Sequence, residues 1–117
     1  MRRALRNALG GVAGLALLFL GACAGSADRA PAAAAVTVKD FAFGPQAIRV
    51  RAGGTVTWTN HDAFDHSIQA DAAGFAGPKF GPVSTPTTFS HRFDRPGTYR
   101  YICGVHNSMT GTVIVTT

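Results

Sequence analysis

Residues 55–59 have the sequence TVTWT, in which polar and apolar side chains alternate. Successive side chains of an extended chain point to opposite faces, so Val56 and Trp58 share one face and three threonines share the other. β-branched and aromatic residues in this alternation are typical of a half-buried strand. Gly53-Gly54, directly before the segment, predicts a turn. The segment therefore favours an all-β fold.

The same alternation returns in short runs over residues 36–117, where no long stretch has the apolar period of a helix. Turn residues such as Gly44-Pro45 and Arg95-Pro96-Gly97 separate the runs. The expected strands cover residues 36–38, 41–43, 47–51, 55–59, 66–70, 89–93, 99–103 and 111–117, and a long loop covers residues 71–85. About seven or eight short strands at this spacing predict one β-sandwich domain.

A short apolar stretch opens the chain. Residues 8–20 are apolar apart from three glycines, and Arg2, Arg3 and Arg6 precede them. Thirteen residues span about 20 Å as a helix, which is short of the roughly 30 Å hydrocarbon core of a membrane. A basic start, a short apolar centre and small residues before the break predict a secretory signal peptide over residues 1–22.

The end of this segment, LGAC at residues 20–23, resembles a bacterial lipobox, in which the signal is cut before a cysteine that then carries lipid. The resemblance makes Cys23 the expected lipidation site, and two or more acyl chains suffice for stable anchoring. Cleavage elsewhere and an uncleaved anchor helix remain open alternatives. The rest of residues 23–35 has no aromatic or branched aliphatic residue and predicts a tether. Residues 36–117 are then the folded domain.

The positive charge belongs largely to the segment expected to be removed. The whole chain has a formal net charge of +5, and residues 1–22 hold three arginines and no acid, so +2 remains without them. A charge this small gives no support to nucleic-acid binding. The two cysteines, Cys23 and Cys103, exclude a four-thiolate zinc site and argue against a disulfide-stapled miniprotein.

Residues 103–109, CGVHNSM, place a thiol, an imidazole and a thioether within seven residues. The glycine after the cysteine permits a tight turn at the end of a strand, so one hairpin can direct these donors toward one point. A thiolate, imidazoles and a weak axial thioether suit copper in both oxidation states. Such a site needs a second imidazole, for which His61, His66 and His91 are the candidates.

Two segments carry a family resemblance. Residues 57–66, TWTNHDAFDH, and residues 96–103, PGTYRYIC, resemble the first-ligand segment and the penultimate strand of cupredoxins. The C-x2-H-x2-M loop is similar to the short loop of amicyanins, within the plastocyanin-like proteins. The resemblance covers residues 36–117 and implies a Greek-key β-sandwich with one type 1 (blue) copper site.

By this resemblance, His66, Cys103 and His106 lie in the trigonal plane around copper, and Met109 lies on the axis. Packing of Met109 in the core is the strongest alternative among the four. Strand alternation points His61 toward solvent, because Asn60 precedes it. His91 lies between two phenylalanines on an inward face, where a hydrogen-bonded core position or a place near an open edge is expected.

The family passes electrons through the exposed edge of one ligand histidine, which by position is His106. The expected patch around it contains Phe64, Phe80, Pro82 and Val105, although an ordinary core position is the alternative for both phenylalanines. A small apolar patch suits brief docking of a redox partner.

Two departures from the amicyanin pattern concern the surroundings of the sulfur. The residue after the cysteine carries a hydroxyl in that family and is Gly104 here, which puts the usual bridge from Asn60 in doubt. Val105 replaces a proline and brings an N–H group, which we expect to donate to Cys103. An added N–H···S bond raises the reduction potential, so Val105→Pro is expected to lower it.

The sequence thus predicts a monomeric electron carrier, which is not an enzyme, with donor and acceptor proteins as partners. It is expected to be exported to the periplasmic or cell-surface face of a bacterial membrane and held there by lipid. The alternative is a copper-binding module that buffers or delivers metal. A multicopper enzyme would need further copper ligands, and the chain has no His-x-His pair and no second cluster.

Overall fold

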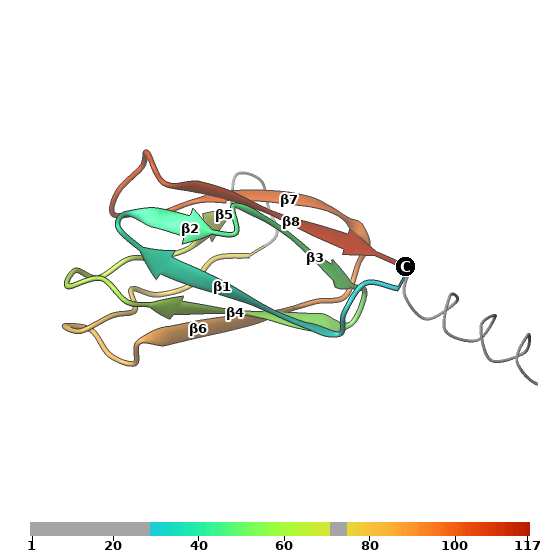
Figure 1. The fold of residues 1–117 in the computed structure, drawn as a ribbon, viewed down its shortest axis with the longest axis horizontal. Coiled ribbons are helices and arrows are strands. Elements are labelled where there is room, and N and C mark those ends of the chain that lie inside the picture. Colours follow the sequence, from blue (N-terminus) through green and yellow to red (C-terminus); the bar gives the residue numbers. More distant parts are fainter. Residues whose placement is uncertain (1–28, 71–74) are drawn as a thin grey trace, which may run out of the picture.

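The computed structural model describes residues 29–70 and 75–117. The expected signal peptide and Cys23 lie outside the described residues. Eight strands form a two-layer β-sandwich (Figure 1), which confirms the predicted fold class. The strands are β1 (Ala33–Lys39), β2 (Ala42–Gly44), β3 (Ala47–Arg51), β4 (Gly54–Asn60), β5 (Gln69–Ala70), β6 (Thr88–Phe93), β7 (Gly97–Ile102) and β8 (Thr110–Thr116).

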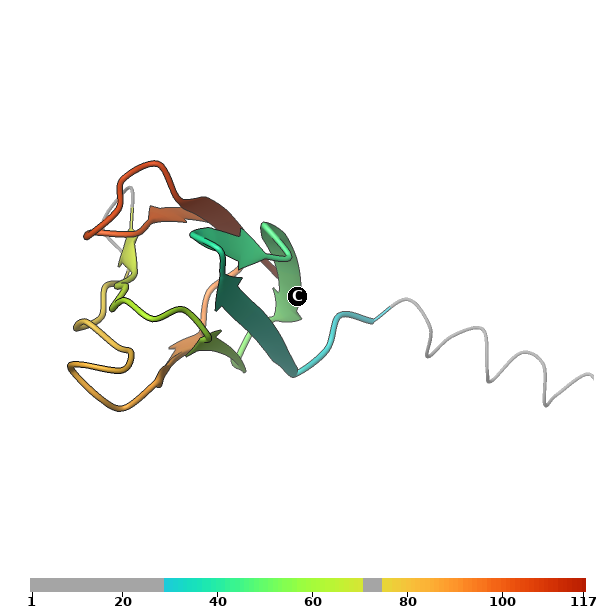
Figure 2. The ribbon, with the colours of Figure 1, turned by 60° about the vertical axis from the view of Figure 1, so that its left-hand side comes forward.

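The two sheets have four strands each. One sheet has the order β2-β1-β4-β6 and the other the order β3-β8-β7-β5, and Figure 2 shows the two layers from a second direction. The pairs β1–β4 and β3–β8 are parallel, whereas the other neighbours are antiparallel. Among the described residues, no strand pairs across the two sheets, so the layers are held together mainly by the side chains packed between them.

The first strand begins earlier than the sequence predicts. Residues 33–35 pair in parallel with residues 55–57, and Thr55 N–H donates to the carbonyl of Ala32 at 3.0 Å. Alanine offers little side chain to bury, but its backbone can still complete the ladder with β4. The last residues of the expected tether are therefore part of the sheet, and the domain does not start at Val36.

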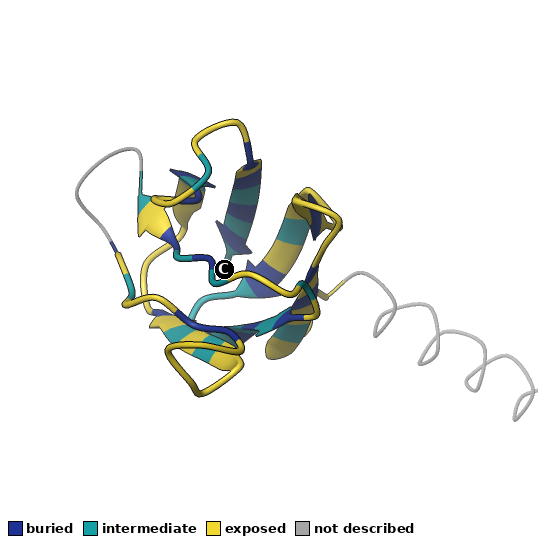
Figure 3. Cartoon of the chain, turned by 90° about the vertical axis from the view of Figure 1, so that its left-hand side faces the viewer, coloured by how far each residue is buried: buried dark blue, intermediate teal, exposed yellow. Residues whose placement is uncertain are grey.

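Buried and exposed positions alternate along the strands (Figure 3), and aromatic side chains form a large part of the core between the sheets. Trp58 is fully buried and its Nε1–H donates to the hydroxyl of Tyr101 at 3.0 Å. The ring of Phe43 lies edge-on to Tyr101, with centroids 4.9 Å apart. Burial raises the pKa of Tyr101 to about 12, although the hydrogen bond from Trp58 opposes the shift. The alternation at residues 55–59 thus predicted the centre of the core.

The expected strand at residues 66–70 is shorter in the structure. Only Gln69 and Ala70 form β5, while His66 makes an isolated bridge with Phe80 through paired backbone hydrogen bonds of 3.1 and 2.8 Å. The chain that follows is anchored by two buried rings, Phe75 and Phe80. The described part of the predicted long loop is therefore packed against the sandwich.

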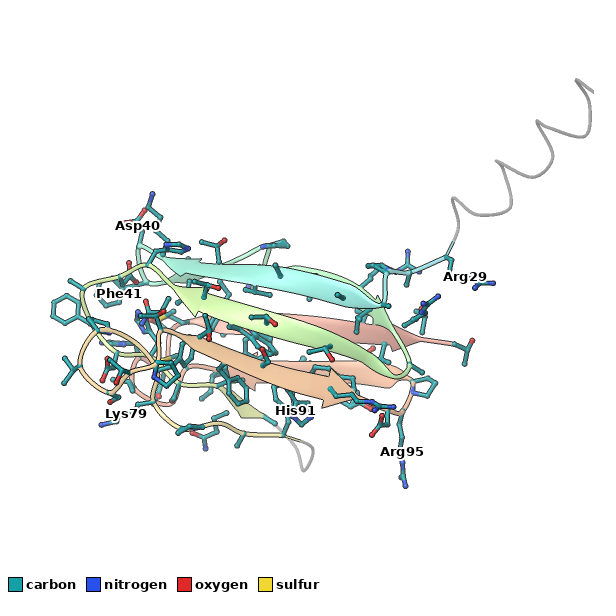
Figure 4. The ribbon with its side chains drawn as sticks, turned by 90° about the horizontal axis from the view of Figure 1, so that it is seen from below. Arg29, Asp40, Phe41, Lys79, His91 and Arg95 are labelled. Atoms are coloured by element: carbon teal, nitrogen blue, oxygen red, sulfur yellow. The ribbon has the colours of Figure 1, made fainter. Side chains whose placement is uncertain are left out.

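The turn between β1 and β2 and the loop between β5 and β6 lie at the same end of the sandwich. Asp40, Phe41 and Lys79 lie at this end in Figure 4, and Arg29 and Arg95 lie at the other. The described part of the chain contains no helix with the length and apolarity needed to cross a membrane.

Candidate metal centre

Three potential metal donors meet at the loop end of the sandwich. His66 Nδ1 lies 3.6 Å from Cys103 Sγ and 3.2 Å from His106 Nδ1, and the three donor atoms all lie within 4.8 Å of one another. His66 and Cys103 are fully buried, while His106 is half-buried. Among the described residues, this is the one group of histidine, cysteine and acidic side chains placed to hold a metal ion.

Each donor is fixed by the strand next to it. His66 is held by its backbone bridge to Phe80, and Cys103 follows the last residue of β7. The loop between β7 and β8 is closed by two backbone bonds, from Cys103 N–H to the carbonyl of Met109 at 3.1 Å and from Met109 N–H to the carbonyl of His106 at 3.0 Å. Met109 is buried. The spacing C-x2-H-x2-M therefore becomes one tight loop under the site.

The chemistry of these donors fits copper. His66 Nε2 lies 2.9 Å from Asp62 Oδ2, and because an ionised carboxylate only accepts, the ring nitrogen donates. This fixes the proton on Nε2 and leaves the Nδ1 lone pair facing Cys103 and His106. Two imidazoles, one thiolate and a thioether form the soft donor set of type 1 copper sites.

Two backbone N–H groups approach the sulfur. Ser67 N–H and His106 N–H each lie 3.4 Å from Cys103 Sγ. Among the described residues, Val105 N–H is not a donor to the sulfur, so the expectation for Val105 is wrong. The turn after Cys103 instead directs the N–H of His106, the residue after Val105, back at Sγ. The sequence could not distinguish these two neighbours, because the choice depends on the dihedral angles of the turn.

Ser67 is a functional neighbour that the sequence analysis missed. Its hydroxyl oxygen accepts the N–H of Gly104 at 3.0 Å, so it ties the segment that carries His66 to the segment that carries Cys103. A Cβ atom on Gly104 would lie 2.7 Å from this oxygen, which is closer than real side chains approach. The position of Ser67 directly after His66 was the signal in the sequence that could have indicated this role.

Asn60 closes the loop that leads to the first histidine. Its Nδ2 donates to the carbonyls of Phe64 at 2.8 Å and Phe80 at 3.0 Å, and its Oδ1 accepts the N–H of Asp62 at 2.8 Å. Its side chain thus reaches neither Gly104 nor the sulfur. The doubt about a bridge from Asn60 is confirmed, since Ser67 makes the bridge to Gly104.

Asp62 connects the first histidine to the turn between β1 and β2. Besides the His66 ring, its carboxylate accepts the N–H of Asp40 at 2.6 Å and that of Phe41 at 3.0 Å. Burial alone would raise the pKa of Asp62, but the hydrogen bonds from Phe41, His66 and Asp40 outweigh it and hold the pKa below its usual value. The carboxylate is therefore ionised and fully engaged.

The comparison with known proteins agrees with this geometry. Residues 31–116 match the family described as copper binding proteins, plastocyanin/azurin family. The chain belongs to this cupredoxin family. The metal ligands of this cupredoxin are His66, Cys103, His106 and Met109, which form one type 1 copper site.

Its relatives include two amicyanins. Amicyanin-alpha of Methylorubrum extorquens is 32% identical over 114 residues, which is 96% of this chain and 96% of the relative. Amicyanin of Paracoccus denitrificans is 32% identical over 92 residues, or 77% of this chain and 70% of the relative.

Solved structures show the same fold. A purple cupredoxin from Nitrosopumilus maritimus has a TM-score of 0.62 at 28% identity and covers 71% of this chain and 99% of its own. A variant of amicyanin with Cu(I) has a TM-score of 0.63 at 28% identity, and the match covers 76% of this chain and 87% of the amicyanin chain. A copper-containing nitrite reductase from Thermus scotoductus has a TM-score of 0.64 at 27% identity, but this chain spans only 23% of it.

Large apolar side chains of the cupredoxin lie exposed near the site. The exposed ones are Phe41, Phe64, Val83 and Val105, and the predicted Pro82 is exposed as well. Phe80 is only 1% exposed, so it is a core residue and not part of a surface patch. Its backbone bridge to His66 turns the ring inward, which the sequence of an irregular loop could not reveal. The sequence did not indicate that Phe41 and Val83 belong to this exposed apolar surface.

Phe41 lies closest to the ligand histidines in this surface. Its ring stands edge-on to His106, with centroids 5.0 Å apart, and to His66, with centroids 5.6 Å apart. The ring of Phe64 lies 5.7 Å from it. The expected position of Phe64 at the surface is consistent with its 58% exposure.

The other two histidines, His61 and His91, are not part of the donor group. His61 is exposed, as alternation predicted. His91 is half-buried on the edge strand β6 and stacks on Phe75 with centroids 5.1 Å apart. Burial lowers the pKa of His91, and the charge of Asp94 opposes this. Of the two expected environments, the position near an open edge is the one found.

Proposed function

We propose that this cupredoxin carries single electrons between protein partners. The observation that carries the proposal is the convergence of His66 Nδ1, Cys103 Sγ and His106 Nδ1 within 4.8 Å at the end of a packed sandwich. Bound copper supplies a one-electron couple between Cu(I) and Cu(II) at such a donor set.

The chain contributes rigidity around these donors. His66 is locked through Asp62 and Phe80, and the loop of Cys103 and His106 is locked through Ser67 and Met109. Ligands held by their surroundings need not move when the charge of the site changes, so little reorganisation accompanies electron transfer. A buffering site would instead benefit from ligands that open and release the metal.

Electrons would pass through the half-buried His106 at the loop end. The proposed docking patch contains Phe64, Pro82 and Val105, joined by Phe41 and Val83. Apolar side chains exposed around one ligand edge provide a small, dry contact, which suits partners that must dissociate quickly. The partners are expected to be an electron donor and an electron acceptor protein.

We further propose that residues 1–22 direct export and that Cys23 carries lipid on the periplasmic or cell-surface side of a bacterial membrane. The basic start, the short apolar stretch and the LGAC sequence support this. Incorporation of labelled fatty acid into the full chain, and its loss in Cys23→Ser, tests the anchor. Incorporation that persists in Cys23→Ser contradicts it.

The experiment for electron transfer uses the domain loaded with Cu(II). An intense blue absorption band, a type 1 paramagnetic spectrum and a reversible one-electron couple are expected, and Cys103→Ser should abolish the band. His61→Ala is the matched control, because His61 is exposed and is not part of the donor group. A colourless or tetragonal Cu(II) site, or rapid loss of copper to a chelator, would favour buffering instead.

A further inference from the structure

We propose that Asp62 is a positioning residue that lowers the reduction potential of the copper site through its bond to His66, and that it fixes the turn carrying Phe41 over the site. This inference rests on copper binding at the site described above. The residue is not a metal ligand in this arrangement, since its oxygens are engaged by other groups.

The geometry singles out this carboxylate. The side chain of Asp62 is only 9% exposed, and Oδ2 lies 2.9 Å from Nε2 of the fully buried His66. The same carboxylate accepts the N–H groups of Asp40 and Phe41. Three donors therefore surround one ionised side chain, which lies directly behind a metal ligand.

A carboxylate in this place changes the ligand. Its negative charge attracts the Nε2 proton of His66 and makes Nδ1 more basic. A more basic imidazole near a fixed negative charge stabilises Cu(II) more than Cu(I), so the reduction potential falls. The two N–H···S bonds to Cys103 act in the opposite direction, because they withdraw electron density from the sulfur. The reduction potential of the site therefore depends on the balance between the carboxylate, which lowers it, and the two N–H···S bonds, which raise it.

The carboxylate also holds a strained turn. Asp40 and Phe41 have φ angles of 53° and 56°, a left-handed conformation that side-chain-bearing residues rarely adopt. Their N–H groups both point to Asp62, so the bonds favour this conformation. Figure 4 shows the two residues together at the loop end. The ring of Phe41 is thereby kept edge-on to both ligand histidines.

The test compares Asp62→Asn with Asp65→Asn in the copper-loaded protein. The Asp62→Asn amide keeps the shape and one acceptor oxygen but removes the charge. We expect the affinity for Cu(II), relative to Cu(I), to fall about tenfold, within the range seen when groups behind a ligand are replaced. For a one-electron couple, tenfold corresponds to a potential about 59 mV higher.

Asp65 is a matched control in the same loop. Its carboxylate accepts the backbone N–H groups of Val83 and Ser84, both at 3.0 Å, and the Ser84 hydroxyl, and although Asp65 directly precedes His66 in the chain, these bonds do not include a ligand side chain. Asp65→Asn should move the potential much less. An equal shift in both variants would mean that loop charge alone acts, and an unchanged or lowered potential in Asp62→Asn would likewise overturn the proposal.

A second measurement needs no variant. In the Cu(I) protein, the Nε2 proton of His66 should give a nitrogen-coupled NMR signal that exchanges slowly with water, because it is buried against Asp62. Absence of this signal overturns the proposal even where Asp62→Asn does not fold. The outcome is separate from the proposed function, since a wild-type protein without a blue band fails the function, whereas a blue wild type without the protected proton fails only the role of Asp62.

Discussion

At the scale of single residues, the hydroxyl of Tyr101 shows how burial becomes a dependence of stability on pH. It lies in the core and accepts only the indole N–H of Trp58. The folded protein therefore resists ionisation of this group, while an unfolded chain does not. A tyrosine with ordinary exposure has a pKa near 10.

This difference predicts a loss of stability in base. The folded pKa of Tyr101 is about 12 and the unfolded one is about 10, so its contribution is complete below pH 10 and declines as the pH rises toward 12. The expected loss is on the order of 2 kcal/mol over this range. Urea unfolding of the copper-free protein between pH 9 and pH 12 measures it.

The variant Tyr101→Phe separates this contribution from that of other groups. It should be less stable than wild type at pH 8 by about 1–3 kcal/mol, because Trp58 loses its acceptor in the core. Its stability should nevertheless fall less steeply above pH 10. Tyr99→Phe serves as the control, since the Tyr99 hydroxyl bonds to an exposed carbonyl, that of Arg95. Equal slopes for wild type and Tyr101→Phe would refute the assignment.

At the scale of elements, β7 and β8 meet through a glycine. A Cβ atom on Gly111 would lie 2.3 Å from the ring of Tyr101, so the aromatic ring occupies the space of the missing side chain. Gly111 pairs directly with Tyr101 in the antiparallel ladder. The ring of Tyr101 thus packs directly on Gly111 between the two strands that flank the metal loop.

Gly111→Ala is predicted to destabilise the domain by about 1–3 kcal/mol, because the ring must move within a full core. Gly44→Ala in β2 is the matched control, since its Cβ atom would be 3.9 Å from the nearest atom, the carbonyl oxygen of Thr37. Thermal unfolding of both copper-free variants compares them. A similar melting temperature for the two would contradict the close contact.

The strands also show what the sequence could predict. Alternation placed Val56 and Trp58 on one face, and both are buried, because a period of two has only one way to bury its apolar side. Three of the four metal ligands lie in the C-x2-H-x2-M segment, and His66 followed from the resemblance of residues 57–66 to the first-ligand segment of cupredoxins. Irregular segments carry no such period. The sequence therefore could not decide whether Phe80 lies in the core or at the surface.

The same reasoning explains which parts of the site were missed. Asp62 contacts Phe41 across 21 positions of the chain, and Ser67 contacts Gly104 across 37. Such hydrogen bonds depend on how two loops approach each other, and neither loop shows this in its own sequence. The ligands could be predicted from local spacing at residues 103–109 and from the family resemblance at residues 57–66, whereas the groups that orient them could not.

At the scale of the whole molecule, bound copper would add a further connection between loops that Ser67 already ties together. The described domain is small, and a domain of this size buries a modest fraction of its unfolded surface. Copper held by His66, Cys103 and His106 together binds the folded state more tightly than the unfolded one, which shifts the folding equilibrium by mass action.

Copper loading should therefore raise the free energy of unfolding by about 2.7 kcal/mol when free copper exceeds the dissociation constant a hundredfold. Calorimetry of the reduced protein with and without Cu(I) measures this increment. Cys103→Ser should lose most of it, whereas His61→Ala should keep it. An increment that survives in Cys103→Ser would place the stabilising metal elsewhere on the protein.

The two ends of the sandwich also differ in what can be attached to them. Arg29 and the metal loops lie at opposite ends (Figure 4), with the length of β4, seven residues or about 23 Å, between them. A fusion protein or solid support joined upstream of Arg29 therefore leaves the face around His106 free for a soluble partner. An electrode bound at the Arg29 end would contact the protein far from the copper site. Direct electron exchange with an electrode therefore requires attachment beside Val105 instead.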